Sequence, residues 1–252
     1  MTEILQVEHL SKQYPGFTLQ DISFSVKPGC IMGLIGKNGA GKSTTLKSIL
    51  NMVRPESGTV TMLGKDFYGN EKECKQDIGV VFGGIDFYPL KKLSAITAVT
   101  RRFYKDWDQE RYNDYLRQFS LDENKQFRSL SNGMKVKYLL ALALSHHATL
   151  YLLDEPTSGL DPVSRDEILH IFTRIVKDGK RSVLFSTHIT SDLDRYADDI
   201  TYIQNGKVLQ SADKDTFLHS FEHLKTAEDT SPLTLEEIML RTEGRTLDET
   251  AL

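Results

Sequence analysis

The 252-residue sequence has only two cysteines, Cys30 and Cys74, and no long uninterrupted apolar run. Two cysteines are too few to hold a secreted fold together, so we expect reduced thiols in a cytoplasmic protein. No segment approaches the roughly 18 consecutive apolar residues of a membrane-spanning helix. Residues 1–4 lack the basic start of a signal peptide. The chain also has no excess of basic residues, since its net charge is −4. This argues against nucleic acid as a partner, because a phosphate backbone requires a basic surface.

What the sequence does contain is a glycine-rich loop between a predicted strand and a predicted helix. The loop reads GKNGAGKST over residues 36–44 and follows the apolar run 31–35. This G-x-x-x-x-G-K-S spacing is typical of a phosphate-binding P-loop, because glycines let the backbone approach a polyphosphate and the helix N-terminus faces the anion. We expect Lys42 to reach the β- and γ-phosphates and take part in catalysis, and the Ser43 hydroxyl to bind Mg²⁺. The nucleotide-binding candidates are Gly36, Lys37, Asn38, Gly39, Ala40, Gly41, Lys42, Ser43 and Thr44.

Two adjacent carboxylates follow a short apolar strand in the second half of the chain. The strand covers residues 150–153, and Asp154 and Glu155 come directly after it. Such folds place an aspartate beside Mg²⁺ at the carboxyl end of a buried strand, so Asp154 is a metal-site candidate. Side chains alternate along a strand, so we expect Glu155 to face the water that attacks the γ-phosphate and to act as a catalytic base. A further apolar strand, 182–187, precedes His188, a candidate catalytic contact to the γ-phosphate.

Over residues 3–210 the chain resembles the ATP-binding subunits of ABC transporters, and further motifs match in order. Tyr14 stands where that family stacks an aromatic ring on adenine. Residues 130–135, LSNGMK, stand at the position of the family signature LSGGQ, which implies nucleotide contacts by Ser131 and Gly133. Residues 158–161 are similar to the loop that crosses the family's dimer interface, and residues 186–188 to its switch-histidine motif.

The chain departs from the family pattern in two places. The signature has Asn132 in place of glycine and Met134 in place of glutamine, but its serine and second glycine are intact, so we expect phosphate binding there to survive. Gly83 stands where the family normally has a glutamine that contacts Mg²⁺ and the attacking water and senses the membrane partner. We expect this change to affect the coupling of ATP hydrolysis to the membrane partner rather than the binding of ATP. Asp86 is a candidate substitute, although a plain loop aspartate is the preferred interpretation.

The motifs and the resemblance together imply an α/β fold with a P-loop NTPase (RecA-like) core. We expect an N-terminal antiparallel β subdomain, beginning with strands in residues 1–29, and an inserted α-helical subdomain over about 91–140. Strand–helix alternation returns over 141–210 and ends in a hairpin, which Asn205 and Gly206 predict. We place the ATPase domain at 1–225, followed at 226–252 by a C-terminal helix and a polar tail that is loose from residue 241.

The resemblance implies an ATPase subunit that binds ATP and Mg²⁺ and powers a separate membrane permease. In the family the signature segment faces the P-loop of a second subunit, which supplies charge stabilisation from the other side of the γ-phosphate. The expected partners are therefore transmembrane permease subunits and an ATP-dependent head-to-tail dimer with itself or a related ATPase subunit. The location would be cytoplasmic, peripheral on the inner face of the cell membrane. The signature variant and the missing glutamine resemble the bacterial branch of drug, antibiotic or peptide exporters.

Other functions remain open at this point. The chain could serve an importer, or it could be a regulatory ATP switch with no role in transport. A GTPase is disfavoured, because the nearest approach to the base-reading Asn-Lys-x-Asp motif, residues 124–127, lacks the aspartate. Translation factors of the ABC class usually carry two cassettes and chromosome-maintenance members carry long coiled coils. This sequence has one cassette and no sustained heptads.

Overall fold

An antiparallel sheet forms the N-terminal part of the computed structural model, which describes residues 3–82, 88–226, 229 and 231–248. In spatial order its described strands are β2 (Phe17–Val26), β1 (Leu5–Tyr14), β4 (Ser57–Met62) and β5 (Lys65–Asp66). Inward-facing residues alternate along β1, as expected for a sheet with one buried face. The antiparallel N-terminal sheet was predicted. Its second half comes from residues beyond the P-loop helix, which wrap back to pair with β1.

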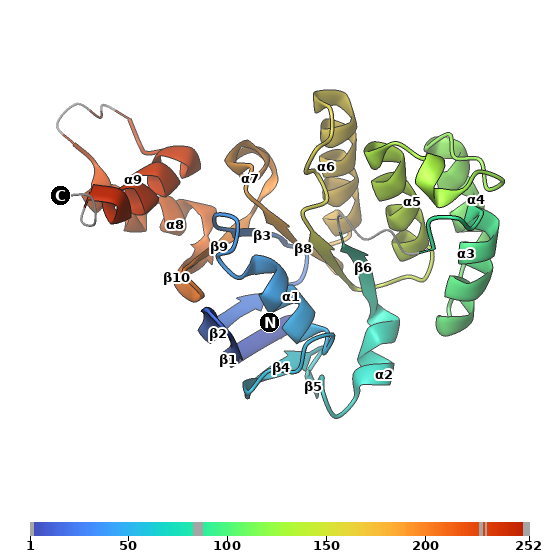
Figure 1. Cartoon of the computed structure of the whole chain (residues 1–252), viewed down its shortest axis with the longest axis horizontal. Coiled ribbons are helices and arrows are strands. Elements are labelled where there is room, and N and C mark those ends of the chain that lie inside the picture. Colours follow the sequence, from blue (N-terminus) through green and yellow to red (C-terminus); the bar gives the residue numbers. More distant parts are fainter. Residues whose placement is uncertain (1–2, 83–87, 227–228, 230, 249–252) are drawn as a thin grey trace.

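A mostly parallel sheet contains the P-loop strand and lies above the antiparallel sheet in the view of Figure 1. In spatial order the described strands are β10 (Lys207–Asp213), β9 (Asp199–Gln204), β3 (Ile31–Ile35), β8 (Ser182–Thr187), β7 (Leu150–Asp154) and β6 (Ile78–Phe82). Only β10 runs antiparallel within this described set, as the second strand of the predicted hairpin. Strand β3 is flanked by β8 and β9, which follow it by about 150 residues or more in the chain.

Helices cover the central sheet, and further helices lie beyond it on both sides of the molecule (Figure 1). They are α1 (Lys42–Ile49), α2 (Glu71–Cys74), α3 (Leu93–Thr100), α4 (Gln109–Gln118), α5 (Asn132–Leu144), α6 (Pro162–Val176), α7 (Thr190–Tyr196), α8 (Lys214–Ser220) and α9 (Leu235–Asp248). Short 3₁₀ turns cover Lys75–Asp77, Arg101–Phe103, Phe127–Ser129 and Glu222–Leu224. The predicted α/β class is confirmed. Helices α3 to α5 lie in the region of the predicted helical insert, about 91–140, and α5 continues past it to Leu144.

The helical insert is held together by side-chain caps and by a buried hydroxyl cluster. Asp108 caps α4 by accepting a hydrogen bond from the Arg111 amide, so the helix begins one residue after it. The hydroxyl of Thr97 on α3 lies within hydrogen-bond distance of the hydroxyls of Tyr112 on α4, at 2.7 Å, and of Tyr138 on α5, at 2.9 Å. All three residues are buried, so this cluster fixes the three helices against one another.

The parallel sheet separates two apolar clusters of the described residues. Because side chains alternate, Tyr151 and Leu153 of β7 join the cluster on the helical side, while Leu152 joins the cluster below α1. Cys30 and Cys74 both lie in the second cluster, as buried free thiols. Burial raises the pKa of both thiols, which keeps them protonated at neutral pH.

The C-terminal helix differs from expectation. Residues from 241 onward were predicted to be a loose polar tail, but α9 continues to Asp248. Leu235 and Ile238 are buried on its inner face, and Arg241 donates to both carboxylate oxygens of Asp229, at 2.5 and 2.7 Å. The polar C-terminal part of the helix is therefore held by contacts such as the Arg241–Asp229 pair, and it is not a solvated tail. The division of the chain at residue 225 stays a prediction.

None of the helices in the described residues combines the length and the apolar character needed to cross a bilayer.

Candidate functional site

The P-loop turns sharply between the end of β3 and the start of α1. Gly36 has φ +150° and Gly41 has φ +118°, both in the region that favours glycine. A Cβ at Gly36 would lie 2.2 Å from the carbonyl oxygen of Ile203 on β9, so no larger residue fits. The loop is therefore held against the sheet by close backbone contact. This leaves its amides and the first turn of α1 at the carboxyl edge of the sheet.

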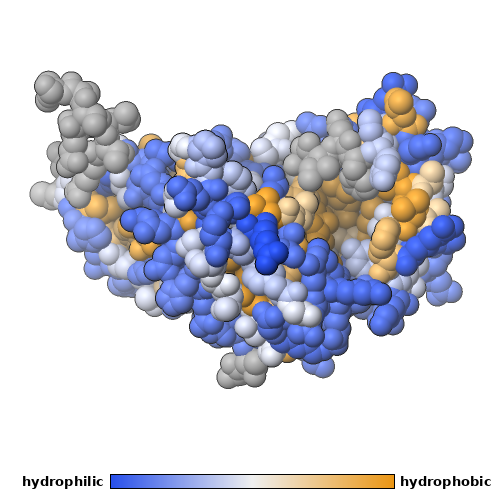
Figure 2. All heavy atoms as spheres, turned by 60° about the horizontal axis from the view of Figure 1, so that its bottom comes forward, coloured by the Kyte–Doolittle hydropathy of each residue, from blue (hydrophilic) through white to orange (hydrophobic). Residues whose placement is uncertain are grey.

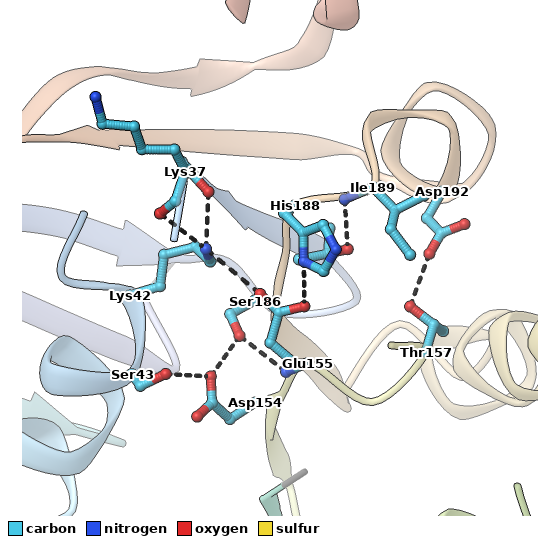
Figure 3. Close-up of polar contacts among 12 residues, drawn as sticks. Lys37, Lys42, Ser43, Asp154, Glu155, Thr157, Ser186, His188, Ile189 and Asp192 are labelled. Carbon is cyan, nitrogen blue, oxygen red and sulfur yellow. Dashed lines mark hydrogen bonds and ion pairs between the residues drawn. The ribbon is translucent and has the colours of Figure 1, made fainter. Parts of the chain in front are cut away.

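Lys42 lies inside the turn of this loop, with only 6% of its surface exposed (Figure 3). Its Nζ donates to the carbonyl oxygen of Gly36 at 2.7 Å and to that of Lys37 at 3.4 Å. The same Nζ lies 3.4 Å from Oε1 of Glu155. This buried amino group therefore joins the phosphate-binding loop to the predicted base.

Asp154 lies at the end of β7 and is bonded from two neighbouring elements. Its Oδ1 accepts from Ser43 Oγ on α1, at 2.9 Å, and from Ser186 Oγ on β8, at 2.6 Å. The carboxylate is almost fully buried. Oxygen donors of this kind suit Mg²⁺, so Ser43 and Asp154 fit the predicted metal role. In the described residues no three His, Cys, Asp or Glu side chains gather to form a metal site, so the ion would also need phosphate and water oxygens.

Glu155 leaves the strand in a left-handed conformation, with φ +50°. That conformation is unusual for a residue with a side chain and costs about 1–2 kcal/mol. Two hydrogen bonds hold this turn. The backbone amide of Glu155 donates to the Ser186 hydroxyl at 2.9 Å and to the Ser186 carbonyl oxygen at 3.2 Å. As a result the Glu155 carboxylate turns toward Lys42 and His188, with Oε2 at 2.8 Å from His188 Nδ1 (Figure 3).

Ser186 was missed as a site residue, although a signal for it existed. The parallel register places it beside Asp154, because the carboxyl ends of neighbouring parallel strands share an edge. Its hydroxyl donates to the Asp154 carboxylate and accepts from the Glu155 amide, so it fixes both predicted acids.

A second missed group links the loop after Glu155 to helix α7. Asp192 on α7 is 3% exposed and accepts from Thr157 Oγ1, at 2.8 Å, and from Arg165 Nε, at 2.6 Å. Thr157 lies just after the acidic pair, and Asp192 lies four residues after His188. The network therefore joins the backbone that carries Glu155 to the backbone that carries the histidine.

The other predicted nucleotide contacts are carried by β1 and α5. Tyr14 ends β1, is 37% exposed and has the amino group of Lys12 over its ring, 5.6 Å from the centroid. Ser131 caps α5 by accepting from the Met134 amide, at 3.2 Å, and Gly133 lies in the first turn. Figure 1 shows α5 and α1 in different parts of the molecule, so Ser131 and Gly133 are not brought to this P-loop.

The expectations about Gly83 and Asp86 concern residues outside the described ranges. The strand that precedes them, β6, ends at Phe82, which pairs with Asp154 in the parallel register.

An apolar groove lies between the sheet and the helical insert. It encloses a cavity of about 250 Å³. Its lining residues come from β6, from the segment that begins at the end of α3, and from α5: Val80, Phe82, Thr100, Tyr104, Leu139, Leu142 and Ala143. Exposed apolar side chains follow along the same helical side, including Val99 and Phe103. In Figure 2 a hollow with apolar walls opens on the right of the molecule, the side on which Figure 1 places these elements.

Comparison with known proteins places these features in one family. Residues 19–158, more than half of the chain, match the family model described as ABC transporter. The chain is 30% identical to the bacitracin transport ATP-binding protein BcrA of Bacillus licheniformis, over 89% of this chain and 72% of that protein. It is 33% identical to the Nod factor export ATP-binding protein I of Ralstonia nicotianae, over 86% and 70%.

Solved structures agree with this assignment. An ATP-binding subunit of an ABC transporter superposes with a TM-score of 0.82 at 27% identity, over 95% of this chain and 99% of that one. An ATP-binding cassette in a dimeric post-hydrolysis state with ADP and phosphate shares the fold, with a TM-score of 0.72 at 22% identity over 83% and 98%. Together with the P-loop and the acids beside it, these matches show that the chain belongs to the ABC transporter family, as one of its ATP-binding and ATP-hydrolysing subunits.

Proposed function

We propose that this subunit drives export of an antibiotic, drug or peptide-like substrate through a separate membrane permease, using Mg²⁺-bound ATP. The observation that carries the chemistry is the meeting of Lys42, Ser43, Asp154, Glu155 and His188 at one edge of the sheet (Figure 3). These five polar side chains are linked by the Ser43–Asp154 and Glu155–His188 hydrogen bonds and by the Lys42–Glu155 ion pair, and Ser186 joins the two acids. They suit the binding of a polyphosphate and the activation of a water beside it.

The first part of the mechanism is phosphate binding. The P-loop amides and the N-terminus of α1 face the β- and γ-phosphates, and Lys42 exchanges the carbonyl oxygens of the loop for phosphate oxygens. Ser43 and Asp154 would hold Mg²⁺, and Ser186 keeps the Asp154 carboxylate in place. The ion, when bound, neutralises charge that develops on the phosphate oxygens.

The second part is activation of water. When Lys42 moves its charge onto the phosphates, the Glu155 carboxylate loses its contact with this cation, and its oxygen becomes available to a water. Glu155 then accepts the proton of the attacking water, and His188 holds the carboxylate through its Nδ1 and contacts the γ-phosphate through the other edge of its ring.

The third part is dimer formation. The Ser131 oxygen accepts from the Met134 amide, which leaves the hydroxyl hydrogen free to donate to a phosphate. Gly133 and the first turn of α5 add backbone amides at a helix N-terminus, which favours an anion. We propose that this surface meets the P-loop of a second subunit, head to tail, so that two ATP molecules lie between the subunits. Tyr14 would stack on the adenine.

The direction of transport rests on the relatives. Two of them are named for bacitracin transport and for Nod factor export. A methionine import ATP-binding protein of Bifidobacterium longum is also similar, at 31% identity over 77% of this chain, but this chain covers only 51% of it. Export is therefore preferred, with import as the alternative. In either case the subunit would lie on the inner face of the membrane, held by its permease.

The apolar groove is the surface that best fits a permease. Its walls are apolar and concave, and they begin at β6, whose end pairs with Asp154. A helix of a membrane protein that filled it would contact β6, the strand next to the one that ends in the catalytic acids.

We expect Thr100→Arg to reduce co-purification of a membrane protein at least about 10-fold, because it places a charge in an apolar contact that would then be desolvated. Thr173→Arg is the matched control, since Thr173 also lies on a helix and also bonds a carbonyl of its own turn. Both variants are expressed in the native host and purified in mild detergent, and bound membrane proteins are identified by mass spectrometry. Equal recovery with both variants would count against the groove, and no membrane protein with the parent would count against transport.

Ser43→Ala tests the metal role. We expect the Mg²⁺ concentration for half-maximal ATP turnover to rise on the order of 10-fold, because one oxygen ligand is replaced by water. ATP affinity measured with EDTA should change less than about twofold, since Lys42 and the loop amides remain. A Mg²⁺ titration that matches the parent would remove Ser43 from the metal site.

A further inference from the structure

Helix α9 contacts the P-loop through an ion pair. Oε2 of Glu243 lies 2.9 Å from Nζ of Lys37, the second residue of the loop. The glutamate side chain is 16% exposed and the lysine side chain is 51% exposed. The other oxygen of Glu243 accepts from the hydroxyl of Tyr202 on β9, at 3.0 Å. Burial and the nearby carboxylate raise the pKa of Tyr202, so this hydroxyl stays a donor at neutral pH.

The position of Glu243 is set by the docking of α9. Thr234 and Glu237 form a reciprocal cap at the start of the helix, with hydrogen bonds of 2.8 and 3.2 Å. Arg241 holds Asp229 and also donates to the carbonyl oxygen of Leu224, at 3.0 Å. With apolar residues buried on its inner face as well, α9 presents the Glu243 carboxylate to the loop from a defined place.

Lys37 has its charge turned away from the nucleotide site. Its carbonyl oxygen accepts from Lys42, but its side chain extends in the opposite direction from Lys42 in Figure 3. One ion pair, Lys37 with Glu243, lies on the side of α9, and another, Lys42 with Glu155, lies on the side of the phosphates. In the first pair Glu243 neutralises the charge of Lys37, which weakens the attraction of the loop for a polyanion.

We infer that Glu243 is a positioning residue that acts through Lys37: it holds this lysine against α9 and so weakens the binding of ATP to the P-loop. The inference rests on the proposed phosphate site around Lys42. Its physical basis is that an unpaired lysine on a flexible stem would rotate toward the phosphates and attract them. ATP carries more negative charge than ADP, so its affinity should respond more.

The test is Glu243→Gln, which removes the charge but keeps the size and an acceptor for Tyr202. We expect the Kd of ATP, measured by calorimetry with EDTA at low ionic strength, to fall 3- to 10-fold. The Kd of ADP should fall less, and both effects should shrink in high salt. Glu236→Gln is the matched control, because Glu236 is exposed on the same helix. If Glu243→Gln does not fold, Glu243→Met removes the same charge and should give the same shift.

A double-mutant cycle separates this role from a purely structural one. In a Lys37→Met background, Glu243→Gln should leave the Kd of ATP unchanged, because the charge through which it acts is gone. An equal shift in both backgrounds, an unchanged Kd, or weaker binding in Glu243→Gln would overturn the inference. A parent protein that binds no ATP would instead contradict the proposed phosphate site. The two failures are therefore distinct.

Discussion

Glu155→Gln is expected to lower steady-state ATP turnover by about 10²- to 10⁴-fold, the usual contribution of a general base. Glutamine has the same shape and can still accept a hydrogen bond from His188, but it cannot take a proton from water. The backbone turn at this position is held by Ser186 and does not depend on the carboxylate. The affinity for ATP should therefore stay within about threefold of the parent, or about 0.7 kcal/mol.

The control for this substitution is Glu167→Gln, which removes an exposed carboxylate that pairs with Lys137 on the helical side. Its turnover should match the parent. Phosphate release and nucleotide binding are measured on the same samples, so that a loss of binding is not taken for a loss of chemistry. If Glu155→Gln keeps turnover within about threefold of the parent, Glu155 is not the base.

Ser131→Glu is expected to abolish ATP-dependent dimer formation. The assay uses the Glu155→Gln protein, in which ATP should persist and hold the subunits together, whereas ADP should leave monomers. A carboxylate at the N-terminus of α5 would repel the γ-phosphate of the facing subunit, where the wild-type hydroxyl and amides attract it. Light scattering after size exclusion gives the mass directly.

Ser129→Glu is the matched control for charge, because Ser129 lies two residues before the cap and bonds the carbonyl of Gln126 instead. Loss of the Ser131 cap costs about 0.5–2 kcal/mol, so the unfolding temperature of each variant is measured as well. An ATP-independent mass in the Glu155→Gln protein, or a dimer that persists in its Ser131→Glu derivative, argues against the head-to-tail arrangement.

The local elements of the site were predictable because each has a strong short-range signal. The run before Gly36 is apolar throughout, as a strand buried on both faces requires, and the glycine spacing marks the turn. Asp154 likewise ends an apolar run. Both strands belong to one mostly parallel sheet, with β8 between them. The α/β pattern predicts that the carboxyl ends of such strands share one edge, where the P-loop and the acids lie.

Features that depend on distant partners were not predictable. The left-handed turn at Glu155 exists because Ser186 binds its amide, and a glutamate gives no local sign of such a conformation. Strand β4 joins the N-terminal sheet by pairing with β1, and β5 joins it by pairing with β4. The segment after Arg241 is polar, and composition alone cannot tell a solvated tail from a helix whose charges pair with Asp229 and Lys37.

The place of β3 in its sheet has a consequence for the synthesis of the chain. Ile31 pairs with Val183, and Met32 with Asp199, so the strand that carries the P-loop is translated long before either neighbour. The N-terminal sheet is complete at Asp66 and can form early, whereas the central sheet must wait for contacts of very high sequence separation. In a nascent chain that stops before residue 182, neither β8 nor β9 is present to pair with β3. Nucleotide can therefore stabilise this site only after β8 and β9 have been translated, and ATP cannot guide the steps of folding that come before them.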